Sequence, residues 1–120
     1  MPFKRILEQA VTGLPHAEGA ILTDWEGEAV EHFCYGDPFR LKVIGAHKGI
    51  ILGRLKELHA SRGGAEAIES VVIRTGEAQL AVGAVGPDYA LVILTGRDTL
   101  MGQTLHRMRH TVALLEKEIY

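Results

Sequence analysis

Apolar residues recur along the chain at two spacings, which separate predicted helices from predicted strands. Spacings of three and four residues, bounded by Gly, Pro, Asp or Thr, predict helices over about 3–14, 38–62 and 100–119. Runs rich in β-branched and aliphatic residues predict strands over 19–24, 28–35, 68–75, 78–85 and 89–95. We expect Asp37 to cap the middle helix and Asp98 or Thr99 to cap the last one. The predicted order is helix, two strands, helix, three strands, helix.

Short connections between the strands predict antiparallel pairing. Asp24–Gly27 joins the first two strands, and Gly76-Glu77 and Gly86–Asp88 join the last three. Connections of this length allow only antiparallel neighbours. The run Tyr89–Leu94 is apolar at odd and even positions, so we expect this strand to be covered on both faces and central. One α/β (α+β) domain over 1–120, with helices on both faces of an antiparallel sheet, accommodates every apolar stripe.

The predicted middle helix carries more apolar surface than packing against one sheet requires. One arc is assigned to the sheet and contains Leu41, Ile44, Ile51, Leu52, Leu55 and Leu58. The opposite side carries a second apolar seam, made of Phe39, Val43, Ala46, Ile50 and Gly53. A second seam predicts a second packing partner.

Between these two faces, Gly45, Gly49 and Gly53 follow one another at four-residue intervals. Each glycine costs a helix interior about 1 kcal/mol relative to alanine, so we infer that another backbone lies close along this ridge, most simply the same helix of a second copy. Alternatively, the glycines fit against the sheet, and a loop covers the seam or leaves it partly exposed. The candidate dimer or partner interface consists of Phe39, Val43, Ala46, Gly49, Ile50 and Gly53. Ile50→Glu should weaken association without unfolding the domain, because it would bury an unpaired charge.

Composition and charge argue against nucleic acid and anionic membranes as partners. At 120 residues, 47% hydrophobic and 23% charged, the chain has the composition of one globular domain. A net charge of −2 favours neither nucleic acid nor an anionic membrane surface, both of which attract clustered Lys and Arg. The single cysteine, with no secretory signal and no apolar run long enough to span a membrane, predicts a cytoplasmic location.

Catalytic and metal-binding motifs are not evident. His106 and His110 are four residues apart on one predicted helix, but Arg107 and Arg109 flank them and no third ligand is evident, so we interpret them as a solvated surface. Cys34 has no neighbouring group that would activate its thiol. We predict a protein that is not an enzyme, with no catalytic residue, no cofactor and no metal.

In the order of its elements, the whole chain resembles the Roadblock family, which includes dynein light chains and bacterial regulators of small GTPases. Three segments carry the resemblance, namely the hairpin Glu18–Gly27, the meander Ser70–Leu94 and the closing amphipathic helix. The resemblance implies a profilin-like sandwich, in which a five-stranded antiparallel sheet has the middle helix on one face and the N- and C-terminal helices on the other. It also implies a homodimer, in which the middle helix and the strand at 68–75 pair with their copies.

The resemblance further implies that the partner is a small Ras-like GTPase, whose GTP hydrolysis the protein could stimulate. Repositioning of the GTPase's own loops is favoured over an arginine finger, for which Arg40 and Arg54 are the candidates. Because a fold does not determine a function, two other classes stay open: a nucleotide-independent structural subunit of a larger complex, and a small-molecule sensor domain. A sensor requires a cavity between sheet and helix, whereas the large aliphatic core residues predict a filled core.

Overall fold

The computed structural model describes residues 2–24, 26–61 and 68–120 of the chain. Within these residues it has three helices, α1 (Pro2–Thr12), α2 (Pro38–Ser61) and α3 (Met101–Ile119). The five strands are β1 (Ala17–Asp24), β2 (Ala29–Cys34), β3 (Ser70–Arg74), β4 (Ala78–Val85) and β5 (Tyr89–Gly96). The predicted types and order of the elements are confirmed. The predicted end of the middle helix at residue 62 lies outside the described residues.

All five strands belong to one antiparallel sheet, in the order β2-β1-β5-β4-β3. β5 is central, with β1 on one side and β4 on the other, and its residues from Ala90 to Thr95 are all buried. The prediction of a central strand covered on both faces is therefore confirmed. β2 and β3 form the two edges of the sheet.

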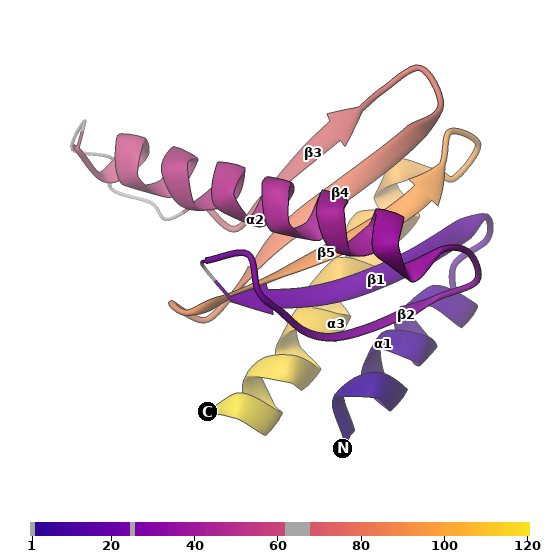
Figure 1. The fold of residues 1–120 in the computed structure, drawn as a ribbon, viewed down its shortest axis with the longest axis horizontal. Coiled ribbons are helices and arrows are strands. Elements are labelled where there is room, and N and C mark those ends of the chain that lie inside the picture. The colour runs from indigo at the N-terminus through magenta and orange to yellow at the C-terminus, as the bar shows by residue number, and fades with distance from the viewer. Residues whose placement is uncertain (1, 25, 62–67) are drawn as a thin grey trace.

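Helices cover both faces of this sheet (Figure 1). α2 crosses one face, and α1 and α3 lie side by side against the other. Alternate residues of each strand point into the two layers, so Ala20 and Ile93 pack under α1 and α3, whereas Ile21 and Val92 pack under α2. The predicted three-layer arrangement, with the middle helix alone on its face, is confirmed.

The start of α3 differs from the prediction. Leu100 occupies the N-cap position, and no side chain caps the helix. The hydroxyl of Thr99, one of the two predicted caps, instead donates a hydrogen bond of 2.8 Å to the carbonyl of Pro15. Thr99 is buried, so this bond ties the start of α3 to the connection between α1 and β1. The prediction of a cap by Asp98 or Thr99 was wrong because the helix begins later than predicted, so that Leu100 takes the N-cap position.

A buried amide holds the turn between β5 and α3. Gln79 on β4 is only 3% exposed, and its Nε2 donates to the carbonyls of Gly96, Arg97 and Thr99 at 3.2, 3.2 and 2.8 Å. These carbonyls lie where β5 ends and the chain turns toward α3. One side chain therefore donates to three carbonyls of this turn, of which Gly96 also accepts from the backbone N–H of Thr99.

Both ends of α3 are anchored to other elements. Nη2 of Arg107 donates to the carbonyl of Gly13 at 3.2 Å, so Arg107, predicted on a solvated face, lies against the end of α1. At the other end, the ring of Tyr120 lies against Gly86, which has a positive φ of 60°, and its hydroxyl donates to Oδ2 of Asp88 at 3.2 Å. These contacts hold the turn between β4 and β5 against the C-terminal end of α3.

Candidate functional site

α2 begins where the sequence predicts it. Oδ1 of Asp37 accepts a hydrogen bond of 2.9 Å from the backbone N–H of Phe39, as expected of an N-cap residue. Pro38 occupies the first helical position, where its lack of an N–H costs nothing. This cap fixes the direction in which the first turn of α2 presents its side chains.

The sheet-facing side of α2 agrees with the prediction except at its far end. Leu41 and Leu52 are buried in the core beneath the helix, and Ile44, Ile51 and Leu55 are half-buried. Leu58, which was also assigned to this side, is 51% exposed. That assignment was wrong because the last turns of α2 extend past the body of the sheet (Figure 1).

The glycine ridge packs inward at Gly45. A Cβ at this position would lie 2.7 Å from Cγ2 of Ile21 and 3.3 Å from Cγ2 of Thr23, both on β1. Gly45 therefore brings α2 close to the sheet of its own chain, and the inference that it makes room for a second helix was wrong. The alternative interpretation holds at this position. Gly53 is half-buried, and the surroundings of Gly49 lie outside the described residues.

The second seam is partly covered and partly exposed. Ala46 packs against the turn of the hairpin. A Cβ placed on Gly27 would lie 3.1 Å from the Cβ of Ala46. Phe39 and Val43 are 72% and 54% exposed. The side chain of Ile50 lies outside the described residues, so the predicted effect of Ile50→Glu stays a prediction. The exposed apolar part of the seam is therefore the first part of α2.

The edge strand β3 has an unpaired backbone on its outer side. In an antiparallel pair, every second residue bonds to the neighbouring strand, and the residues between them point their N–H and C=O away from it. The bonded residues run from Glu69, opposite Ala84, to Thr75, opposite Ala78. The N–H and C=O of Ser70, Val72 and Arg74 therefore point outward. In the described part of the chain, no side chain bonds to this edge. An edge of this kind is a template for pairing with another strand.

The other edge, β2, is partly protected by its own side chains. The backbone N–H of His32 donates to Oε1 of Glu31 at 3.0 Å. Burial lowers the pKa of His32, and the positive charges of Lys42 and Lys4 lower it further. Of the two edges, β3 is therefore the more open to another chain, because no outward N–H of its described residues is engaged by a side chain.

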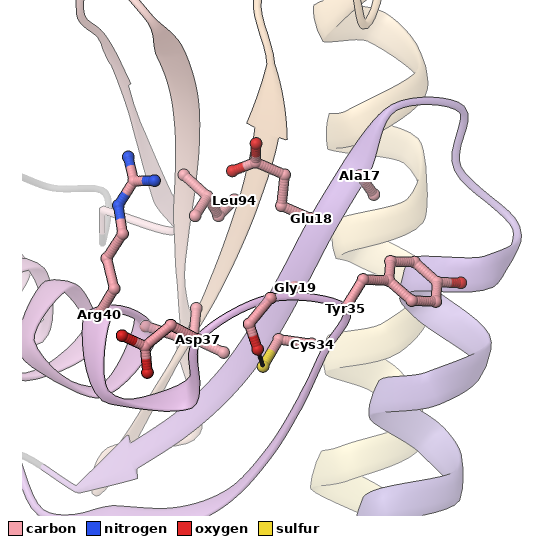
Figure 2. Close-up of a pocket in the computed structure, with 10 residues that line it drawn as sticks. Ala17, Glu18, Gly19, Cys34, Tyr35, Asp37, Arg40 and Leu94 are labelled. Carbon is pink, nitrogen blue, oxygen red and sulfur yellow. Dashed lines mark hydrogen bonds between the residues drawn. The ribbon is translucent and has the colours of Figure 1, made fainter.

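A pocket of about 320 Å³ opens where the start of β1, the end of β2 and the start of α2 meet (Figure 2). Leu41 and Leu94, both buried, contribute apolar surface, and Glu18, Asp37 and Arg40 contribute charges. Sequence reasoning missed this pocket. Its walls come from four segments that no local pattern connects.

The residues considered for catalysis or metal binding are not brought together. Sγ of Cys34 donates to the carbonyl of Gly36 at 3.3 Å, and His106 and His110 are both exposed on α3. Among the described residues, no group of three His, Cys, Asp or Glu side chains could hold a metal ion. None of the described helices is long and apolar enough to cross a membrane.

Solved structures of Roadblock/LC7 and MglB proteins share this fold. A Roadblock/LC7 domain from Streptomyces avermitilis has a TM-score of 0.87 at 18% identity, covering 97% of this chain and 96% of that one. The gliding protein MglB from Thermus thermophilus has a TM-score of 0.83 at 18% identity, covering 96% and 86%. An MglB with a tetrameric arrangement has a TM-score of 0.83 at 19% identity, covering 97% and 88%. The chain thus has the Roadblock/LC7 fold that its sequence resembles.

The likeness extends to profilins. Profilin IA of Acanthamoeba castellanii has a TM-score of 0.61 at 12% identity, covering 98% of this chain and 99% of that one. The predicted profilin-like sandwich is confirmed. The sequence matched no protein-family model and no curated protein.

Proposed function

We propose that this chain, built on the Roadblock/LC7 fold, is a non-enzymatic, homodimeric regulatory or scaffold protein that binds a small Ras-like GTPase. The observation that carries the proposal is the exposure of Phe39 and Val43, at 72% and 54%, near the start of α2. Large apolar side chains exposed near one another mark surfaces that bind other proteins. We infer that they contact a partner rather than solvent.

The open edge of β3 supports the homodimer. A second copy of the same strand, running antiparallel, would satisfy the outward N–H and C=O groups of Ser70, Val72 and Arg74. Such pairing would continue the sheet across the dimer, as the family resemblance implies. The tetrameric arrangement of one structural neighbour, an MglB, supports self-association as well.

The proposal of a GTPase partner rests on two likenesses. Roadblock proteins, which this chain resembles, include regulators of small GTPases, and the gliding protein MglB shares its fold. Binding beside the nucleotide would stimulate GTP hydrolysis by holding the GTPase's own loops in place. Arg40 and Arg54 are both exposed on α2. Under this proposal neither acts as an arginine finger, so Arg54→Ala should retain full stimulation.

The test is capture of partners from a lysate of the native cell by the tagged chain, in GTPγS and in GDP. We expect the wild type to capture a small GTPase preferentially with GTPγS, and Val43→Glu, which should also weaken the dimer, to lose that capture. Gln9→Glu, which makes the same charge change at an exposed position on α1, is the matched control and should behave as the wild type.

Equal capture in both nucleotides, or capture of no GTPase, would contradict the GTPase proposal and favour a structural subunit. A captured GTPase is then purified and its hydrolysis rate measured with and without the chain. An unchanged rate would restrict the function to scaffolding.

A further inference from the structure

The pocket at the start of α2 is not used by the proposed function. At about 320 Å³ it lies at the small end of the range found for ligand sites, so it suits a small metabolite. The buried side chains of Leu41 and Leu94 give it an apolar wall. It opens at the rim of the sheet, where the first turn of α2 meets the ends of β1 and β2, so the filled core does not argue against it.

Two opposite charges line this pocket from different elements. Glu18 extends from β1 and Arg40 from the first turn of α2, and Figure 2 shows Leu94 between their charged ends. Neither charged group has a hydrogen-bond or ion-pair partner among the described residues. The guanidinium therefore keeps its donors, and the carboxylate keeps its acceptors, for a ligand.

The third charge, Asp37, is already engaged at the helix start, because its Oδ1 accepts from the N–H of Phe39. It still adds negative charge to the lining. A purely anionic ligand would be repelled by Glu18 and Asp37, and a purely cationic one would leave Arg40 unpaired and repelled. A ligand that carries both an ammonium and a carboxylate satisfies both charged walls.

We propose that this pocket binds a free α-amino acid with an apolar side chain. The α-carboxylate pairs with the guanidinium of Arg40, whose planar fork suits a carboxylate. The α-ammonium pairs with the carboxylate of Glu18, and the side chain lies against Leu41 and Leu94. The chain would thus carry a small-molecule site that is independent of its protein partner.

Binding is tested by titration calorimetry and thermal shift of the wild-type protein with each standard L-amino acid. We expect at least one apolar amino acid to bind with a Kd of about 1 mM or lower. The corresponding amine without the carboxylate, and the corresponding acid without the ammonium, should each bind at least about tenfold more weakly. Comparable binding of either one would contradict the two-charge proposal.

Two variants locate the site. Arg40→Gln and Glu18→Gln, both at exposed positions, should fold normally by circular dichroism and weaken binding by about tenfold or more. Arg5→Gln on α1 removes an exposed charge that does not line the pocket and should leave the Kd unchanged. The proposal fails if no amino acid binds the wild type at about 10 mM, or if both pocket variants keep the wild-type affinity. Neither result bears on GTPase capture, which uses different residues.

Discussion

Gly45 on α2 lies directly over Ile21 on β1, so that a Cβ on the glycine would be 2.7 Å from Cγ2 of the isoleucine. Ile21 is fully buried and β-branched, so its side chain has no alternative rotamer into which it could move cheaply. At Gly45, α2 therefore packs so closely on the sheet that no side chain larger than the hydrogen of glycine fits.

Gly45→Ala should destabilise the fold even though alanine is the better helix former. Overpacking against Ile21 costs about 1–3 kcal/mol, which exceeds the gain of about 1 kcal/mol in helix propensity. We expect a lower midpoint in urea denaturation with an unchanged slope.

Gly102→Ala is the matched control, because Gly102 lies in α3 and a Cβ there would meet nothing within 4 Å. This variant should be stabilised by up to about 1 kcal/mol. If both alanine variants were stabilised, the close contact between α2 and β1 would be refuted.

Val43→Glu should weaken self-association while the protomer stays folded. Val43 is 54% exposed in the protomer, so the carboxylate remains solvated until a partner covers it, and only association has to bury the charge. Light scattering over a concentration series should give the dimer mass for the wild type and for Gln9→Glu, and a shift toward the protomer mass for Val43→Glu. A wild type that is monomeric throughout would contradict the homodimer.

Gln79→Leu should lower the free energy of unfolding by about 2 kcal/mol. The leucine fills the space but removes the buried Nε2 from which the carbonyls of Gly96, Arg97 and Thr99 accept. Denaturant unfolding measures the loss, and the exposed substitution Gln9→Leu serves as the control. A loss no greater than that of the control would show that water replaces the amide.

The pKa of Tyr120 should lie above the ordinary tyrosine value and fall in Asp88→Asn. Desolvation against the turn raises the pKa of Tyr120, and the hydrogen bond to the Asp88 carboxylate raises it further, because deprotonation would place two negative charges together. The contact therefore stabilises the fold below the ordinary tyrosine pKa, and this stabilisation is lost as pH rises through the folded-state pKa. Phenolate absorbance, after subtraction of the Tyr120→Phe titration, gives the value. The same pKa in wild type and Asp88→Asn would exclude the hydrogen bond as a cause.

Features that depend on neighbouring residues could be predicted from the sequence. The helices and strands follow from local periodicity, the position of β5 from its apolar run on both faces, and the cap at Asp37 from the proline beside it. The role of Thr99 could not be predicted, because its hydroxyl donates to the carbonyl of Pro15, 84 residues away.

The surface of α2 was predictable only in part for a similar reason. Periodicity places Leu58 on the same side as Leu41, but it does not show that the sheet ends before the last turns of the helix. It also cannot tell whether Gly45 faces its own sheet or another chain. The pocket was missed because Glu18, Arg40 and Leu94 become neighbours only after the sheet has formed.

The pairing of β1 with β5 has a consequence for how the chain reaches this structure. The N-terminal hairpin and the C-terminal meander are each local, yet they join only when Ala20 meets Ile93 across the centre of the sheet. That step closes a long loop, and the chain loses the conformational entropy of this loop before the core is complete. We therefore expect folding to be slower than in proteins built from local contacts. Neither half contains both β1 and β5, so the two halves should acquire native order together, in one cooperative transition.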